Sequence, residues 1–391
     1  MLLKEDKWSQ FGHYVVGQDS TPIFHLKLAL EQKRAGRGDV KFIFHDSVFG
    51  SANPKIEPNI DLLELYTQRV HQLRDKYDYI VLMYSGGADS HNVLKCFEHA
   101  DVKLDEVVSF VDSSYKDKDS KVSGEIYKVA VPEVEKYQQH FPECEYRLIE
   151  VRDVQKKLFN DPEFKFDLYQ DLAYQITPVS ILHSFGLHYI DKYRDLHNAG
   201  KKVCVIQGIE KPRLRHRDNK WCFTFNDWSS WFGQKHYFRD FYIYDEFFYW
   251  SPEAPLLPIK QAHVATKYLD YLDLHNTPTD YRNNQMANVV IRKSGVRTNW
   301  EYFNHIIYPF WQQGTFSAGK TFESYITNAR DDTLSHGNDE LLKDYRRAVA
   351  KTLMLAKQTG HHLTPKWLAD ASDTNSVIGI KPMESISHYI E

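Results

Sequence analysis

Cysteine is scarce in this chain of 391 residues, and its cysteines are far apart. They are Cys96, Cys144, Cys204 and Cys222, and no two of them form a C-x-x-C pair. This spacing excludes a zinc ribbon and the disulfide framework of a small secreted domain. It instead predicts reduced and mostly buried thiols, as in a cytosolic protein.

Long apolar runs and a large excess of one charge are also missing. No stretch reaches the about 18 apolar residues of a membrane span, and residues 1–6 contain no apolar segment of a signal peptide. We therefore expect a soluble, cytoplasmic protein without a membrane partner. The net charge of -4 excludes a surface that is basic throughout, but it leaves room for a local basic patch that contacts nucleic acid.

Common catalytic and metal-binding patterns are absent as well. The chain has no H-E-x-x-H and no G-x-S-x-G, and the pair His361-His362 has no further metal ligands at useful spacing. We interpret this histidine pair as a surface feature.

The middle of the chain alternates between strand-like and helical segments. Apolar runs typical of buried parallel strands lie at residues 79–84, 107–111, 146–151 and 203–206. Between the last two runs, a long helical segment at 178–196 precedes Gly200, which suits a left-handed helix cap. This order predicts an α/β fold with a doubly wound, mainly parallel, Rossmann-like sheet.

The flanks of this core have a different pattern. We expect an N-terminal cap at residues 1–77, with a strand at 40–44 and an amphipathic helix at 59–75 that Asn59 or Asp61 caps. The core itself is placed at 78–220. A C-terminal acceptor region at 221–391 begins with the aromatic-rich segment 221–250 and then reads mainly helical, notably at 340–358.

The sharpest motif follows the first strand of the core and opens a helix. Residues 85–90 read Ser-Gly-Gly-Ala-Asp-Ser. A helix N-terminus offers N–H groups and a positive dipole end to phosphate oxygens, and glycines allow close approach of the backbone. The hydroxyls of Ser85 and Ser90 add donors. A carboxylate at Asp89 would best serve as a ligand of Mg²⁺ that bridges to the phosphates.

These six residues match the S-G-G-x-D-S motif of the PP-loop ATP pyrophosphatases, and the strand order of residues 78–215 is similar to that superfamily. It includes the synthetase domain of asparagine synthetase, GMP synthetase, NAD synthetase and several tRNA-thiolating enzymes. The resemblance implies an adenine nucleotide alpha hydrolase-like fold and an enzyme that splits ATP into AMP and pyrophosphate to activate an acceptor. ATP and Mg²⁺ are the cofactors that it implies.

The resemblance also implies roles for single residues. By position, the β- and γ-phosphates of ATP would contact Ser85, Gly86, Gly87, Asp89 and Ser90.

The end of the second strand of the core would meet the rest of the nucleotide. The backbone at Phe110 and Val111 would contact adenine, and Asp112 and Ser113 would reach the ribose or the acceptor. The alternative for Asp112 and Ser113 is a turn cap.

After the fourth strand, the resemblance places Gly208, Lys211 and Arg213 near the α-phosphate or pyrophosphate. Asparagine synthetase has Asp-Glu where this chain has Glu210-Lys211, which leaves open whether the region binds Mg²⁺ or phosphate. Lys211 is suited to stabilise charge when the α-phosphorus is attacked, so we predict that Lys211 and Asp89 are catalytic.

A basic run follows the fourth strand of the core. It contains Arg213, Arg215, His216, Arg217 and Lys220, and it either contacts phosphate or forms a solvated loop.

A second phosphate-loop pattern occurs late in the chain. Residues 314–321 fit the Walker A pattern G-x-x-x-x-G-K-T, but the preceding stretch contains Pro309 and no apolar strand ending in Asp follows. We interpret the match as a coincidence, although Lys320 could still contribute to an acceptor pocket.

The acceptor stays open at this stage. We expect a small molecule or a nucleotide that is amidated or ligated by a nitrogen nucleophile; a nucleic acid is allowed but not required. Because Leu2 rather than Cys follows Met1, the nitrogen would come from ammonia, an amine or another subunit. The alternatives are sulfur transfer to a nucleobase and a nucleotide-binding module without catalysis.

The aromatic-rich segment 221–250 is either core or a stacking platform for a planar acceptor. A homo-oligomer is compatible with the sequence. The chain also resembles phage-encoded members of the superfamily, which would place it in a host cytoplasm.

Overall fold

A computed structural model describes much of the chain, and the fold below refers to these residues. They are 11–24, 26–111, 126–150, 153, 187, 190–208, 211–218, 220–227, 243–274, 304–311, 358 and 383–390.

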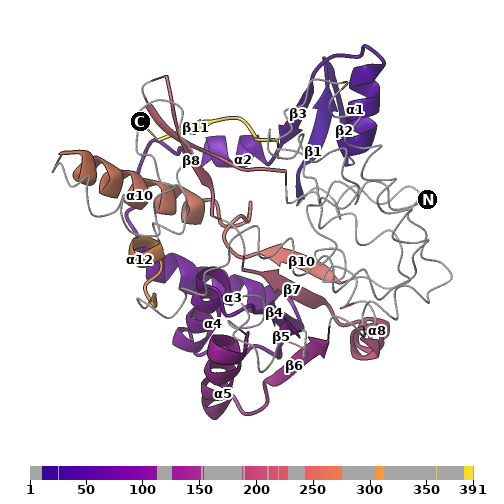
Figure 1. Ribbon diagram of the computed structural model, residues 1–391, viewed down its shortest axis with the longest axis vertical. Helices are drawn as coiled ribbons and strands as arrows, with labels where there is room; N and C mark the ends of the chain where they lie inside the picture. The colour runs from indigo at the N-terminus through magenta and orange to yellow at the C-terminus, as the bar shows by residue number, and fades with distance from the viewer. Residues whose placement is uncertain are drawn as a thin grey trace, which may run out of the picture.

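The central layer is a five-stranded sheet in the order β10-β7-β4-β5-β6, in which every neighbouring pair is parallel (Figure 1). Its strands are β4 (Tyr79–Met83), β5 (Glu106–Val111), β6 (Glu145–Glu150), β7 (Val203–Gln207) and β10 (Tyr244–Phe247). The four predicted core strands are confirmed, each end within one residue. The fifth strand, β10, was not predicted and lies beyond residue 220.

Helices cover both faces of this sheet (Figure 1). On one face lie α3 (Leu62–Lys76), α4 (Ala88–His99) and α5 (Val131–His140), the last preceded by a π-helical turn, η4 (Ile126–Ala130). On the other face lies α8 (Asp191–Asn198). Alternation along β4 explains the two cores, because Leu82 packs toward the first face and Val81 toward the second. The predicted α/β class with a parallel, two-sided sheet is therefore confirmed.

Helix boundaries follow the caps that the sequence provides. The side chain of Asp61 accepts a hydrogen bond from the backbone N–H of Glu64 (2.7 Å), so Asp61 rather than Asn59 caps α3. At the end of α8, Gly200 adopts a φ of 78°, the left-handed conformation that was predicted for it. Residues 178–186 of the predicted helix at 178–196 lie outside the described residues.

The N-terminal part forms a second, antiparallel sheet in the order β2-β1-β3. The strands of this sheet are β1 (His13–Val16), β2 (Asp19–Ile23) and β3 (Val40–Ile43). The same part of the chain contains the helices α1 (Leu26–Arg34) and α2 (Asp46–Ser51). The strand predicted at 40–44 is confirmed as β3. The predicted cap also includes α3, which instead covers the central sheet; the domain boundaries themselves stay predictions.

The C-terminal part contributes a third sheet and helices. The sheet has the order β11-β9-β8 and consists of β8 (Arg213–Arg217), β9 (Lys220–Thr224) and β11 (His388–Tyr389). The helices are α10 (Leu256–Leu274) and α12 (Asn304–Ile307). A helical region after Pro258 is thus confirmed by α10, whereas only residue 358 of the helix predicted at 340–358 is described. No helix among the described residues is long and apolar enough to cross a bilayer.

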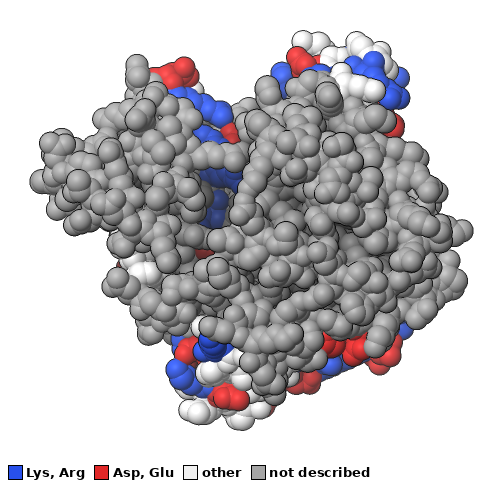
Figure 2. Space-filling view, viewed as in Figure 1, with Lys and Arg blue, Asp and Glu red and all other residues white. Residues whose placement is uncertain are grey.

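The basic run after the fourth predicted strand forms an antiparallel hairpin rather than a loop, and its contact with phosphate stays a prediction. Figure 2, drawn in the same view as Figure 1, shows Lys and Arg side chains where β8 runs. Leu214 is buried in the middle of β8, which anchors the strand to the core. The hairpin therefore holds its arginines in fixed positions.

Candidate functional site

The predicted phosphate loop lies at the point where the sheet order reverses. The chain leaves β4 toward β5 and β6 and then returns to β7, which pairs with the other edge of β4. In open α/β sheets, ligands bind beyond the carboxyl ends of the strands at such a switch point. Residues 84–87 connect β4 to α4 there, and residues 88–90 of the motif are the first residues of α4, which is the strand-to-helix context that the motif requires.

Hydroxyl groups hold the loop in shape. Gly86 has a φ of 76°, a conformation that favours glycine. The backbone N–H of Gly87 donates to Ser85 Oγ (3.3 Å), the N–H of Ser85 donates to Ser90 Oγ (3.3 Å), and the Ser90 hydroxyl donates to the carbonyl oxygen of Gly87 (3.2 Å). The N–H groups in the first turn of α4 have no acceptor within the helix, and they lie next to the loop.

The carboxylate of Asp89 meets a buried lysine. The Lys211 ammonium group donates to Asp89 Oδ1, and a second bond runs from Lys211 to Asn304 Oδ1 (3.0 Å). The side chain of Lys211 is 4% exposed and that of Asp89 is 31% exposed. Two residues that were predicted separately, 122 positions apart, therefore form one ion pair beside the loop.

Two tyrosines complete this cluster, and sequence reasoning missed both as site residues. The Tyr308 hydroxyl donates to Asp89 Oδ1 (2.6 Å), and the Tyr308 ring lies 5.0 Å from the Lys211 ammonium nitrogen. The Tyr249 hydroxyl donates to the backbone carbonyl of Asp89 (2.8 Å) and accepts from the Asn92 amide (3.1 Å). The two rings stack with centroids 5.5 Å apart.

Burial keeps these phenols as donors. It raises the pKa of Tyr308 and of Tyr249 well above the usual value, and the nearby Asp89 charge adds to the effect. Tyr249 belongs to the aromatic segment, and here it serves as core and as a support of Asp89. Nothing in the local spacing marks Asn304 or Tyr308, because Asn304 reaches the site from a short helix far along the chain, α12, and Tyr308 directly follows that helix.

Gly208 lies against the loop, as its position after β7 suggested. A Cβ atom at residue 208 would lie 2.7 Å from the Cα atom of Ser90. Glycine therefore allows the end of β7 to approach the first turn of α4, which brings Lys211 within reach of Asp89.

Other predicted residues lie near the sheet edge or outside the described residues. Val111 is buried at the carboxyl end of β5, and Phe110 packs against both cores of the central sheet. Asp112 and Ser113, with Glu210, lie outside the described residues.

Arg213 begins β8. It donates from Nε and Nη2 to the side-chain oxygen of Asn226 (2.8 Å each) in the amide orientation that satisfies both groups. The guanidinium of Arg213 thus contacts Asn226, whereas the ammonium group of Lys211 contacts Asp89.

The Walker-like residues 314–321, including Lys320, and the pair His361-His362 are also outside the described part. The stretch before residues 314–321 is informative, because residues 304–307 form α12 instead of a buried strand. This result agrees with a coincidental match.

The donor set at the loop fits a metal ion that is held mainly by a nucleotide. Within the described ranges, no three His, Cys, Asp or Glu side chains gather as a metal site. Mg²⁺ in nucleotide sites typically takes one or two carboxylates together with phosphate oxygens and water. Asp89 could supply that carboxylate, and its role as a Mg²⁺ ligand stays a prediction.

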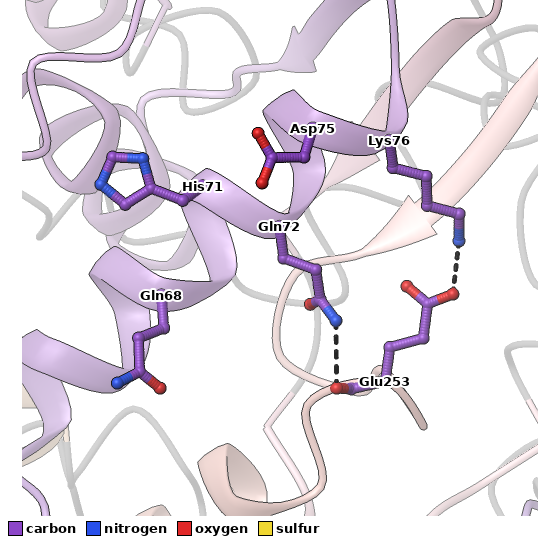
Figure 3. Close-up of a pocket in the computed structure, with 6 residues that line it drawn as sticks. All are labelled: Gln68, His71, Gln72, Asp75, Lys76 and Glu253. Carbon is purple, nitrogen blue, oxygen red and sulfur yellow. Dashed lines mark hydrogen bonds and ion pairs between the residues drawn. The ribbon is translucent and has the colours of Figure 1, made fainter.

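Two cavities of the described part lie away from the predicted site residues. One, of about 620 Å³, lies on the solvent side of α3 and is lined by Gln68, His71, Gln72, Asp75, Lys76 and Glu253 (Figure 3). The other, of about 460 Å³, is lined by Lys95, Glu98, His99, Pro309, Phe310 and Trp311. Neither includes a residue of the loop.

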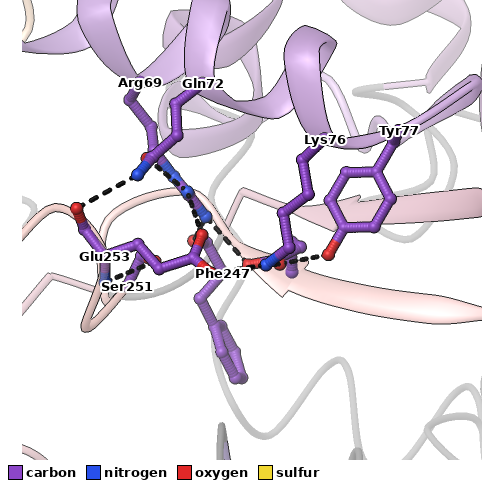
Figure 4. A network of polar contacts seen from close by, with 8 residues as sticks. Arg69, Gln72, Lys76, Tyr77, Phe247, Ser251 and Glu253 are labelled. Atoms are coloured by element: carbon purple, nitrogen blue, oxygen red, sulfur yellow. Dashed lines mark hydrogen bonds and ion pairs between the residues drawn. The ribbon is translucent and has the colours of Figure 1, made fainter.

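A buried ionic network beneath the first cavity is structural (Figure 4). Arg69 of α3, with a fully buried side chain, donates to Glu246 Oε2 of β10 (2.9 Å), and Lys76 donates to Glu246 Oε1 (2.9 Å). Burial alone would raise the pKa of Glu246, but the charges of Arg69 and Lys76 hold that pKa below its usual range. This network fastens the edge strand β10 to α3.

No protein-family model matches this chain, and no curated protein is similar to it in sequence. The loop and the residues around it are therefore the basis of a functional proposal.

Proposed function

We propose that this protein is an ATP pyrophosphatase-type enzyme that adenylates an acceptor. An acceptor oxygen would attack the α-phosphorus of ATP, the bond to the bridging oxygen would break, and pyrophosphate would leave. A nitrogen nucleophile would then displace AMP from the activated acceptor. The observation that carries the proposal is the Ser85–Ser90 loop at the switch point of a parallel sheet, next to a buried lysine.

The loop would hold the leaving pyrophosphate. The first-turn N–H groups of α4 and the hydroxyls of Ser85 and Ser90 are donors for phosphate oxygens. A bound Mg²⁺ would neutralise part of the phosphate charge. Because Asp89 begins the helix beside these donors, its carboxylate is placed to meet such a cation.

Lys211 would stabilise the charge that develops when the α-phosphorus is attacked. Its ammonium is held by Asp89 and Asn304, so little reorganisation is needed when the nucleotide binds. Most of the rate would come from orientation of the two substrates and from this charge neutralisation.

The state of the cysteines favours nitrogen over sulfur as the incoming nucleophile. Cys96, Cys144, Cys204 and Cys222 are free and buried. Burial raises the pKa of all four thiols, that of Cys144 to about 12. Buried thiols of high pKa are poor sulfur carriers, so this chain would need an external sulfur source for the alternative reaction.

Product analysis tests the proposal. We expect the purified protein, with ATP, Mg²⁺ and candidate acceptors, to form AMP and pyrophosphate in equal amounts. ADP and phosphate would instead indicate a Walker-type reaction, and nucleotide binding without AMP would indicate a module without catalysis.

Two variants assign the products to a site. Asp89→Ala should abolish AMP formation, because it removes the partner of Lys211 and the proposed cation ligand, whereas Lys320→Ala should retain most of it. Thermal melts of both variants would separate a lost site from a lost fold. The reverse pattern, activity lost with Lys320→Ala only, would refute the assignment to this loop.

A further inference from the structure

Strand β8 carries arginines at every second position. Arg213, Arg215 and Arg217 alternate with Leu214, which is 1% exposed and packs into the core. Side chains two residues apart point to the same side of a strand. The three guanidinium groups, named the arginine row below, therefore share the face opposite Leu214.

One carboxylate faces this row. Glu384 accepts from Arg215, through Nη2 and through Nε (3.3 Å), and from Arg217 Nη2 (2.8 Å). Burial alone would raise the pKa of Glu384, but the hydrogen bond from Arg215 and the charges of all three arginines hold it below its usual range. The three arginines outnumber the two carboxyl groups on which their charges act, Glu384 and the buried Asp227 beside Arg213.

The row leads outward from the proposed catalytic site. Lys211, which contacts Asp89, lies two residues before β8, and exposure of the side chains rises from 11% at Arg215 to 43% at Arg217. Basic side chains are visible in Figure 2 where β8 runs in Figure 1. Lys211, which contacts Asp89 of the loop, and the arginine row thus belong to one continuous stretch of chain.

We propose that the arginine row binds successive phosphates of a single-stranded nucleic acid and so presents a nucleotide of that strand to the loop. Residues two apart on a strand are about 7 Å from each other, which is comparable to the separation of neighbouring phosphates in an extended nucleic-acid strand. Guanidinium groups recognise phosphate oxygens through paired hydrogen bonds.

The inference rests on the proposed function for the chemical step, but not for binding. The competing explanation is that the ion pairs only fasten the segment around Glu384 to the hairpin. The two explanations predict different effects on nucleic-acid binding when the charge of Glu384 is removed. Removing its charge should strengthen binding of a polyanion, whereas it should only loosen the fold if the ion pairs are structural.

Fluorescence anisotropy with a labelled single-stranded oligonucleotide, the full chain and no ATP tests the proposal. We expect Arg217→Gln to weaken binding by about tenfold and to lower the salt dependence by about one phosphate contact. Arg217→Lys should keep most of the affinity, and Glu384→Gln should raise it. Lys136→Gln is the matched control, since Lys136 is an exposed cation paired with a glutamate on α5, and it should leave binding unchanged.

Several outcomes would overturn the proposal. The first is that the protein does not bind the oligonucleotide at low salt. The second is that Arg217→Gln and a folded Glu384→Gln both bind the oligonucleotide more weakly than wild type. The third is that pyrophosphate or an acidic peptide competes as strongly as unlabelled oligonucleotide. If Glu384→Gln does not fold, the comparison of Arg217→Gln with Arg217→Lys decides. Oligonucleotide binding without AMP formation would refute the proposed function alone, and AMP formation with a small acceptor but no oligonucleotide binding would refute the arginine row alone.

Discussion

At the scale of single residues, Asp89 is the centre of the candidate site. One oxygen of its carboxylate accepts hydrogen bonds from Lys211 and Tyr308, and its backbone carbonyl accepts one from the Tyr249 hydroxyl. Hydrogen bonds to a charged group are stronger than those between neutral groups. Because the Lys211 side chain is almost fully buried, its ion pair with Asp89 offsets the loss of contact with water.

Tyr308→Phe tests the support of Asp89 without changing any charge. The variant loses one hydrogen bond to a carboxylate, which contributes roughly 1.5 to 3 kcal/mol, so we expect AMP formation to fall by about tenfold or more. Tyr389→Phe is the control, because its hydroxyl bonds the exposed Asp218. Steady-state rates at several Mg²⁺ concentrations would measure the effect; equal rates for wild type and Tyr308→Phe would exclude a role of this hydroxyl.

At the scale of elements, the site depends on how closely the end of β7 approaches the start of α4. Helix α4 follows β4, whereas Gly208 follows β7, the neighbouring strand. Gly208 lies against Ser90 in the first turn of α4. The contact is with the backbone of Ser90, so a larger residue cannot be accommodated by rotation of a side chain.

Gly208→Ala should therefore displace the loop from Lys211. We expect a loss of stability of about 1 to 3 kcal/mol and a larger relative loss of AMP formation. Gly50→Ala in α2 is the matched control, since nothing lies within 4 Å of its added Cβ. Chemical denaturation together with product analysis would measure both quantities. A fully active Gly208→Ala would show that the close approach is not needed.

At the scale of the whole molecule, a buried carboxyl joins the N-terminal and C-terminal sheets. Asp227, which is 1% exposed, accepts from the Tyr14 hydroxyl of β1 (2.8 Å) and from the backbone N–H of Met383 (2.9 Å). Burial raises the pKa of Asp227 to about 7, although the bond from Tyr14 and the charge of Arg213 oppose this shift. The carboxyl thus binds a proton more tightly in the folded state.

This raised pKa predicts that folding stability falls as the pH rises. Between the unfolded-state pKa near 4 and the folded-state pKa near 7, the native protein holds more protons than the unfolded chain, so the free energy of unfolding decreases by on the order of a few kcal/mol. Asp227→Asn should flatten this part of the profile, whereas Asp218→Asn should not. Urea denaturation from pH 4 to 8 provides the measurement, and an unchanged slope in Asp227→Asn would contradict the prediction.

The sequence alone determined the four core strands, the left-handed Gly200 and the place of the loop after the first of these strands, and it narrowed the cap of α3 to Asn59 or Asp61. Each depends on local information: apolar runs of strand length, a capping aspartate, or a glycine in a required conformation. It did not reveal β10, because Asp245 and Glu246 interrupt the apolar pattern there; the strand forms because Arg69 and Lys76 of α3 neutralise Glu246.

Only the tertiary structure decided which residues share the site. Lys211 lies 122 positions and Tyr308 lies 219 positions from Asp89, and no local pattern encodes a contact over such separations. The parallel sheet brings the ends of β4 and β7 to one edge. From the C-terminal part, Asn304 of α12 then contacts Lys211, and Tyr308, which follows α12, contacts Asp89. Local chemistry thus specifies the loop at residues 85–90, and long-range packing specifies its partners.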